Sequence, residues 1–524
     1  MEYRVKFLEN EYFYGGAVVN STDMPISSGS RYDRDYTRGG GNQMMPLFLS
    51  TKGRYVWSES LFRVWVEDGA LCFSGDGNFE LYEGGCCLRD AYLAAMETHF
   101  PFDDTRRLGK KLPRVFFETA QYNTWMEFTY DPTEEGVLAY AKRIVEEGFT
   151  PGILMIDEGW QSHYGSWQFD LYKFPHPKEM VEKLHALGFK VMLWVTPLVT
   201  ADGPDYIKCF YREFNPGGLK NLFLRTKSGE VALVKWWNGY SAILDFRKEC
   251  DREYLGSRLT YLMQEYGIDG FKFDGGNVPM YHADNIVNGE AAEDHDPVAL
   301  NIAWNEFGAR YTYHEYKDTY LGGGKATVQR VCDRAHDWGR DGIASLVPSV
   351  ILQGLFGHPF VCPDMVGGGS WLANFQPNFK VDEELFIRSA QASSLFPMMQ
   401  FSWAPWRVLS EEALETVKRS AMLHKEMAKE IVALIEEAER TGEPIVRALC
   451  YNDPEGGYET VTDECMLGRN ILVSPILTEG TREKDVVFPA GVWQDACGNR
   501  YEGRQTVRLA APLDTLLWFR RVKD

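Results

Sequence analysis

Charged residues follow directly after several short apolar runs in the middle of this sequence. These residues are Asp157, Glu158, Asp245, Lys272, Asp274, Glu315, Lys317, Asp333 and Asp364. Tryptophans lie near them in sequence, at Trp194, Trp236, Trp237 and Trp338. Hydrolysis of a glycosidic bond requires two carboxyl groups, one as nucleophile or base and one as acid. A difference between their pKa values assigns the two roles. The pattern favours glycoside hydrolysis, and spacing alone does not select the pair.

Motifs for competing chemistries are missing from the sequence. It has no GxSxG nucleophile elbow and no His/Cys grouping with zinc spacing. The run Gly322–Lys325 lacks the first glycine and the Ser or Thr of a phosphate-binding Walker loop. We therefore expect no metal and no cofactor.

The middle of the chain alternates apolar runs with amphipathic stretches. Strands are predicted at 152–156, 190–195, 242–245 and 270–274, and helices at 178–187 and 249–266. Repeated β-then-α units with apolar strands indicate a parallel sheet covered by helices. The length of this region suits an α/β fold of the (β/α)₈ TIM-barrel type. Active sites of such barrels lie at the carboxyl ends of the strands, so the run-end carboxylates are expected to converge there.

Three domains are expected. Residues 1–112 carry short alternating runs and glycine turns, which predict an N-terminal β-sandwich domain. Residues 113–410 form the barrel, with insertions at 201–241 and 275–310 building loops over one face. Residues 411–524 begin with a charged helical connection and return to β-strands, which predicts a C-terminal β-sandwich domain.

Composition excludes several kinds of partner. The 524 residues hold 55 Lys and Arg against 75 Asp and Glu, a formal net charge of −20. This balance disfavours nucleic acid and an anionic membrane surface, and it favours a neutral small-molecule substrate. No apolar run is long enough for a membrane span, and the N-terminus does not resemble a signal peptide. The ten scattered cysteines suggest reduced thiols, so we expect a cytoplasmic protein. The oligomeric state, including a homo-oligomer, stays open.

Several longer strings resemble a known family. They are Gly53–Ser58, Gln121–Trp125, Ile156–Gln161, Lys173–Pro177, Leu184–Trp194, Trp236–Ala242, Gly270–Gly276 and Pro363–Gly369. Together they resemble glycoside hydrolase family 31, and within it the branch that contains the myogenesis-regulating glycosidase and bacterial α-galactosidases. The likeness covers nearly the whole chain. No single string is specific, but the set is.

The resemblance implies a retaining mechanism with two aspartates. The family nucleophile closes the strand motif that here ends at Asp274. The acid/base follows a later strand, where Asp333 and Asp341 compete. The family pattern Arg-x-x-Asp-Arg-x-x-x-Trp-Gly matches Arg330–Gly339, so Asp333 is preferred. Retention predicts carboxyl groups roughly 5–5.5 Å apart.

The resemblance also implies a sugar-binding set. By motif position its members are Asp157, Trp194, Trp237, Lys272 and Asp364, and we add Arg330, Lys317 and His336. The family usually carries Arg at the position of Lys317, and Lys keeps the charge but loses the bidentate fork. His336 either orients substrate or is a hydrogen-bonded loop histidine.

The expected function is retaining, exo-acting hydrolysis of terminal α-linked sugars, with α-D-galactosides as the substrate that the branch implies. An α-glucosidase or α-xylosidase of the same family is the alternative, with an oligosaccharide or glycoside as the partner in every case. A non-catalytic carbohydrate-binding pseudoenzyme is a second hypothesis, which binding without turnover would support. A barrel lyase or isomerase would require a metal or phosphate site, and the sequence shows neither.

Overall fold

A computed structural model describes residues 2–102, 111–213, 222–370 and 379–522. The chain forms two compact units. We call residues 122–146 and 151–320 the central unit. The remaining residues, 1–121, 147–150 and 321–524, are the terminal unit because they include both chain ends. Each unit is described by itself.

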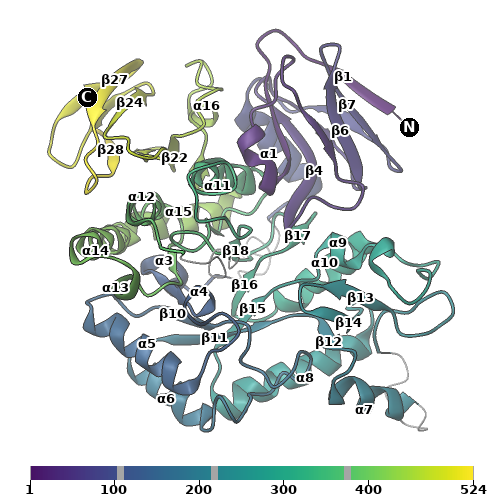
Figure 1. The fold of residues 1–524 in the computed structure, drawn as a ribbon. Helices are drawn as coiled ribbons and strands as arrows, with labels where there is room; N and C mark the ends of the chain where they lie inside the picture. Colours follow the sequence, from purple (N-terminus) through teal and green to yellow (C-terminus); the bar gives the residue numbers. More distant parts are fainter. Residues whose placement is uncertain (1, 103–110, 214–221, 371–378, 523–524) are drawn as a thin grey trace. The chain divides into compact units, whose positions relative to one another are not determined.

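Five parallel strands organise the central unit. In order of pairing they are β9 (Gln121–Asn123), β10 (Ile153–Ile156), β11 (Lys190–Val195), β15 (Gly270–Phe273) and β16 (Tyr313–Tyr316). The helices that alternate with them are α5 (Glu134–Glu146), α6 (Pro177–Ala186), α8 (Glu249–Tyr266) and α10 (Pro297–Gly308). Figure 1 shows α5, α6 and α8 along the outside of the strands. The alternation is the β-then-α pattern that the sequence predicts.

The strands and helices of this unit bury their apolar residues in the pattern that each type of element requires. Every residue of β10 is buried, as a strand covered on both faces should be. Helix α5 buries Val137, Tyr140, Ala141 and Ile144, a spacing that forms a single apolar stripe. The structure places α8 over the same 249–266 span that the sequence predicts.

The terminal unit supplies the remaining barrel strands. Strands β18 (Gln329–Arg330) and β19 (Val361–Cys362) pair in parallel, and Met365 forms a parallel bridge to β20 (Gln400–Phe401). All eight parallel strands belong to one sheet, which confirms the predicted (β/α)₈ barrel.

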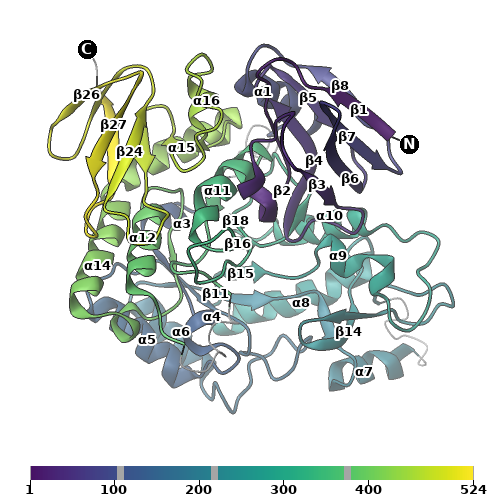
Figure 2. The same ribbon diagram turned by 45° about the horizontal axis from the view of Figure 1, so that its top comes forward.

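Two antiparallel sheets form the start of the terminal unit. One has the order β1-β7-β6-β3 and the other β4-β5-β8, with β2 paired to β4. Their bounds are Glu2–Lys6 (β1), Phe13–Ala17 (β2), Asp33–Asp35 (β3), Gln43–Ser50 (β4), Arg54–Trp57 (β5), Phe62–Glu67 (β6), Ala70–Gly75 (β7) and Glu80–Glu83 (β8). Figure 2 shows β1, β7 and β6 side by side. The predicted N-terminal sheets are therefore present.

The C-terminal part of the same unit is helical and then β. Helices α14 (Glu411–Glu426) and α15 (Ala428–Thr441) precede a six-stranded sheet of order β21-β22-β23-β28-β25-β26 and a separate β24–β27 pair. The strand bounds are Val446–Arg447 (β21), Cys465–Leu467 (β22), Ile471–Ser474 (β23), Glu483–Phe488 (β24), Val492–Gln494 (β25), Arg500–Glu502 (β26), Gln505–Ala510 (β27) and Leu517–Val522 (β28). These are the predicted elements, while the boundaries at 112/113 and 410/411 stay predictions.

The prediction of a barrel strand at 242–245 is wrong. Ala242 and Ile243 belong to β14 (Gly239–Ile243), the middle strand of an antiparallel sheet with β12 (Leu198–Thr200) and β13 (Leu233–Trp236). A short apolar run does not distinguish a parallel barrel strand from a buried antiparallel one. Asp245 forms an ion pair with Arg247, with 2.9 Å between Oδ2 and Nη2. It lies two residues beyond the end of β14 and is buried.

The two predicted insertions hold further secondary structure. Helix α7 (Pro204–Glu213) and β13 lie in the 201–241 insertion, whose residues 214–221 are outside the described part of the chain. Helices α9 (Val278–Tyr281) and α10 lie in the 275–310 insertion.

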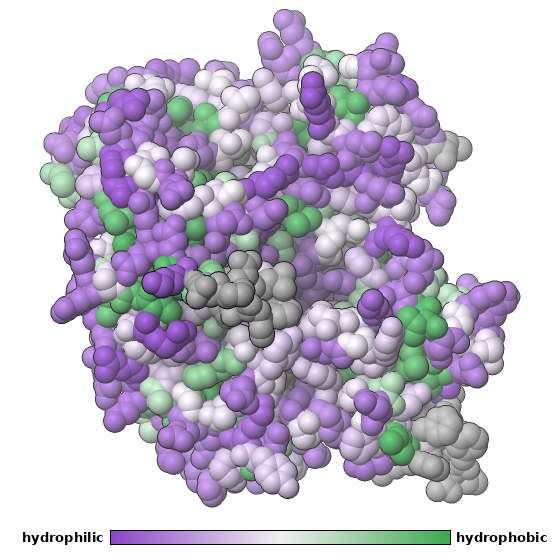
Figure 3. Space-filling view, viewed as in Figure 1, coloured by the Kyte–Doolittle hydropathy of each residue, from purple (hydrophilic) through white to green (hydrophobic). Residues whose placement is uncertain are grey.

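The face of the molecule that Figure 3 shows is mostly hydrophilic. Within the described ranges, no helix has the length and apolar character that spanning a membrane needs. The cytoplasmic location stays a prediction.

Candidate active site

The register of the central strands brings the first candidate residues into one row. Trp194 on β11 lies opposite Lys272 on β15, and Ile156 on β10 lies opposite Leu193. Asp157, one residue beyond Ile156, is therefore level with Trp194. Lys272 and Asp274 are two residues apart and point to the same face of the sheet. The strand ends thus gather two carboxylates, an ammonium and an indole.

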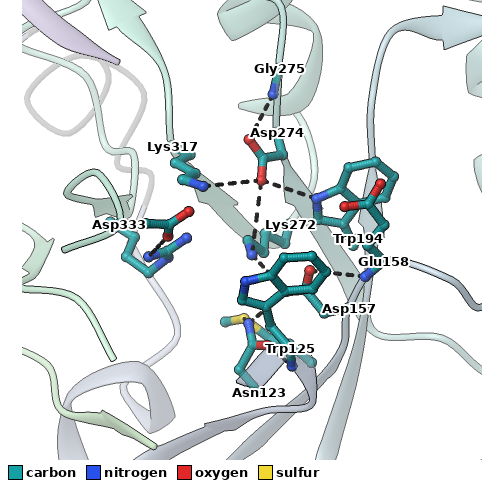
Figure 4. Close-up of polar contacts among 12 residues, drawn as sticks. Asn123, Trp125, Asp157, Glu158, Trp194, Lys272, Asp274, Gly275, Lys317 and Asp333 are labelled. Atoms are coloured by element: carbon teal, nitrogen blue, oxygen red, sulfur yellow. Dashed lines mark hydrogen bonds and ion pairs between the residues drawn. The ribbon is translucent and has the colours of Figure 1, made fainter. Parts of the chain in front are cut away.

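Four groups surround the Asp274 carboxylate (Figure 4). Its Oδ2 accepts a hydrogen bond from Trp194 Nε1 at 3.0 Å, and its Oδ1 accepts one from the Gly275 backbone N–H at 2.8 Å. Two ammonium groups flank Oδ2, Lys317 Nζ at 3.6 Å and Lys272 Nζ at 4.0 Å. The residue is only 5% exposed. Such an environment stabilises the ionised carboxylate that a nucleophile must present.

Asp157 is a buried carboxylate with a different set of partners. Its Oδ2 accepts hydrogen bonds from Lys272 Nζ at 2.6 Å and from Asn123 Nδ2 at 2.8 Å. The side chains of Asp157 and Lys272 are 3% and 2% exposed. Lys272 therefore links the two aspartates of the row, and Asn123 is a member of the site that sequence reasoning missed.

Trp237 enters the site from the inserted sheet. It lies in the turn between β13 and β14 and is 46% exposed. Its Nε1 is 3.3 Å from each carboxylate oxygen of Glu158. The structure thus places five of the predicted sugar-binding residues in the central unit with Asp274, namely Asp157, Trp194, Trp237, Lys272 and Lys317.

The terminal unit carries the second group of candidates, centred on Arg330. Arg330 Nη1 donates to Asp333 Oδ1 at 2.9 Å and to Asp364 Oδ1 at 2.6 Å. The Arg330 and Asp364 side chains have no exposed surface, whereas the Asp333 side chain is 25% exposed. The predicted acid/base and two predicted binding residues therefore form one cluster, in which Asp333 is the member open to solvent.

Asp364 is the buried carboxylate of this cluster, and backbone N–H groups hold it in place. Its Oδ2 accepts hydrogen bonds from the backbone N–H groups of Arg334 at 2.8 Å and Gly369 at 3.0 Å. The pKa of Asp364 is raised to about 6, mainly by burial and also by the nearby Asp333 carboxylate, while the Arg330 charge lowers it. A Cβ on Gly369 would lie 2.9 Å from Asp333 Oδ1, so the backbone approaches this carboxylate closely.

His336 and Asp341 make none of the contacts with Arg330 described above. Gly367 O and His336 Nδ1 are 2.7 Å apart, and the Asp382 backbone N–H donates to Nε2 at 2.8 Å. These bonds order the surrounding loops, and contact with substrate stays a prediction. Asp341, the competitor for the acid/base role, is exposed.

The geometry provides two carboxylate centres with different electrostatics. Asp274 is surrounded by donors and cations, whereas Asp333 pairs with Arg330 and has partial solvent access. Two groups of potential metal ligands occur among the described residues, Cys86/Cys87/Asp90 and Glu2/Glu67/Cys72, and neither includes a residue of this site. Hydrolysis of a glycosidic bond uses two carboxyl groups that lie in different electrostatic environments.

Comparisons with known proteins agree with this assignment. The mouse myogenesis-regulating glycosidase is 31% identical over 422 residues, which cover 78% of this chain and 57% of that protein. Alpha-glucosidase 2 of Bacillus thermoamyloliquefaciens is 26% identical over 417 residues, covering 74% of this chain and 50% of its own. The chain thus spans about half the length of these curated relatives.

Solved structures share the fold. A dextranase of Flavobacterium johnsoniae, complexed with isomaltotriose, superposes with a TM-score of 0.83 at 19% identity, covering 99% of this chain and 66% of its own. A sulfoquinovosidase from E. rectale gives 0.81 at 17% identity, covering 100% and 82%. The model of the family 31 glycosyl hydrolase TIM-barrel domain matches residues 111–425, and that of the family's C-terminal domain matches residues 442–522. The chain belongs to glycoside hydrolase family 31.

Proposed function

We propose that this protein is a retaining, exo-acting α-glycosidase. Asp333 gives its proton to the glycosidic oxygen while Asp274 attacks C1, so the bond to the aglycone breaks and a glycosyl-enzyme ester forms. Asp333, now a carboxylate, takes a proton from water, and that water attacks C1. The sugar leaves with its original configuration and Asp274 is regenerated.

The environment of Asp274 is the observation that carries this proposal. A buried carboxylate with one indole donor, one backbone donor and two lysines within 4.0 Å is kept ionised and pointed in a fixed direction. A carboxylate that only formed a structural salt bridge would need just one of these lysines. Family membership supports the same role for this residue.

The assignment of Asp333 as acid/base rests on its cluster. Partial exposure gives it access to water, and Arg330 fixes its carboxylate. Asp341, in contrast, is exposed. If Asp333 acts with Asp274 by retention, their carboxyl groups come within roughly 5.5 Å in the active enzyme.

We propose α-D-galactosides as the substrate, following the branch that the motifs resemble. An α-glucoside is the second candidate, favoured by the names of several relatives, among them an alpha-glucosidase from Bacillus thermoamyloliquefaciens and another from Hordeum vulgare. Trp194 and Trp237 provide indole groups for either sugar, so the choice needs experiment.

The test is hydrolysis of nitrophenyl α-galactoside, α-glucoside and α-xyloside by wild type and by Asp274→Asn. Preferential cleavage of the galactoside that disappears in the variant supports both the mechanism and the substrate. Cleavage of another sugar keeps the mechanism and refutes the substrate. Binding of sugars without any turnover would instead support a carbohydrate-binding pseudoenzyme.

A further inference from the structure

Glu158 is a buried carboxyl group that the proposed mechanism does not use. It follows Asp157 at the end of β10 and is 3% exposed. The chain turns away at Gly159, whose φ is 93° and whose Cβ, if present, would lie 2.4 Å from the Tyr130 carbonyl oxygen. A side chain there is excluded, so the tight turn allows two consecutive acidic side chains to be buried.

Donors from the inserted sheet converge on Glu158. Trp237 Nε1 lies 3.3 Å from both carboxylate oxygens, and Asn238 Nδ2 donates to Oε1. The same amide donates to the Tyr164 hydroxyl at 3.0 Å, and that hydroxyl is itself hydrogen-bonded to Glu158. The carboxyl group is therefore the common partner of three side chains, two of which are the central residues of one turn.

The base and the tip of this turn are held by different contacts, and the tip relies on Glu158. Strands β13 and β14 pair up to Trp236 and Gly239, so Trp237 and Asn238 form a two-residue hairpin loop. Trp236 is packed in a core cluster with Trp194 and Ile243. The Trp237 ring has an edge contact with Trp236, with 4.9 Å between ring centroids, and is otherwise half-exposed. Core packing fixes the base of the hairpin, and the bonds to Glu158 orient the indole at its tip.

We infer that Glu158 is a positioning residue that latches the Trp237–Asn238 turn to the end of β10 and so fixes the Trp237 indole at the sugar site. The latch itself follows from the contacts. Its importance for sugar binding rests on the proposed function. Glu158 differs from the catalytic residues because it acts through Trp237.

The charge state of Glu158 should control how strongly the turn is held. The pKa of Glu158 is raised to about 8, mainly by burial and also by the Asp157 and Asp274 carboxylates, against the opposing effect of the hydrogen bonds from Tyr164 and Trp237. Tyr130 faces it as well, with a pKa of about 12 that burial and Glu158 raise. Ionised Glu158 makes charge-assisted bonds to the turn, which are stronger than those of the neutral acid. The surroundings of the Trp237 N–H should therefore change near pH 8.

The direct test is NMR of the full chain with ¹⁵N-labelled tryptophan, with the Trp237 indole signal assigned by its loss in Trp237→Phe. In wild type the Trp237 Nε1–H shift should titrate with a midpoint of about 8. In Glu158→Gln the titration should disappear, and in Glu182→Gln, an exposed glutamate on α6, it should persist. A Trp237 signal that titrates equally in wild type and Glu158→Gln overturns the inference.

A second variant covers the case in which Glu158→Gln does not fold. Asn238→Ala removes one donor from the tip of the hairpin and leaves the buried carboxyl in place. It should shift the Trp237 indole signal and increase hydrogen exchange at the Trp237 N–H at least threefold. An unchanged signal and an unchanged exchange rate would contradict the latch.

Kinetics then connect the latch to the proposed function. On the glycoside that wild type cleaves, assayed at about pH 9 where Glu158 is ionised, Glu158→Gln should raise KM about tenfold and change kcat less than threefold, because the carboxylates that do the chemistry remain. A loss confined to kcat would refute a positioning role through Trp237. If wild type cleaves no glycoside, the proposed function fails, while the NMR titration still decides the latch.

Discussion

Replacing Glu158 by glutamine should stabilise the protein, and increasingly so at alkaline pH. The pKa of Glu158 rises from 4.5 to about 8 on folding, a shift of about 3.5 units. Between those two values the folded protein retains a proton that the unfolded chain has lost. The free energy of unfolding therefore falls as pH rises through this window. Glutamine has the same shape and carries no charge, so the variant avoids this loss.

The magnitude follows from the shift. At about 1.36 kcal/mol per pKa unit, the full cost of ionising Glu158 is about 5 kcal/mol above pH 8. Near pH 5 it is only about 1 kcal/mol, so the advantage of Glu158→Gln should grow by about 4 kcal/mol between pH 5 and pH 9. The assay is thermal unfolding of wild type and variant at about pH 5, 7 and 9, where each kcal/mol corresponds to roughly 2–4 °C for a unit of about 150–250 residues.

A matched control isolates the buried carboxyl. Glu182 is exposed on α6, and Glu182→Gln should follow wild type at all three pH values. If Glu158→Gln differs from wild type by a constant amount across the range, Glu158 is ionised in the folded protein as readily as in the unfolded one. The electrostatic description of the site would then be wrong.

Two further predictions concern the lysines. Lys317→Met removes an ammonium 3.6 Å from Asp274, an attraction of about 5 kcal/mol at an effective dielectric constant of about 20. It should lower kcat/KM on the nitrophenyl α-glycoside that wild type cleaves by at least 100-fold, with Lys317→Arg retaining most activity, and a loss below threefold would contradict this. Lys272→Met leaves Asp157 buried without its 2.6 Å partner and should destabilise the protein by about 3–5 kcal/mol in denaturant unfolding. Adding Asp157→Asn should recover part of that loss, and no recovery would show that the pair is not the cause.

Local patterns in the sequence predict much of the fold. The helix at 249–266 and the strand at 190–195 coincide with α8 and β11, because burial imposes a period on each that local sequence displays. The run at 242–245 gave a wrong prediction because local sequence displays burial but not the partner strand. It is apolar and buried, as predicted, but its partners are β12 and β13, and pairing partners are not encoded in a four-residue pattern.

The candidate site was predictable where motifs mark strand ends. Asp157, Lys272 and Asp274 lie where the run-end pattern places them, because the carboxyl ends of parallel strands share one edge. The Lys272–Asp157 contact depends on strand register, which the sequence does not reveal. Glu158 was visible at the end of its strand, but its partner Trp237 lies 79 residues further on in a turn. Only the fold discloses that such a carboxyl is buried.

The central claim is that Asp274 and Asp333 act as nucleophile and acid/base of a retaining α-glycosidase. The most direct measurement is the product formed with azide from an activated aryl α-glycoside, by Asp274→Ala and by Asp333→Ala. In Asp274→Ala azide should replace the missing nucleophile and give the β-glycosyl azide. In Asp333→Ala azide should attack the glycosyl-enzyme and give the α-glycosyl azide. The same anomer from both variants, or no azide product from either while wild type turns over, would contradict the account.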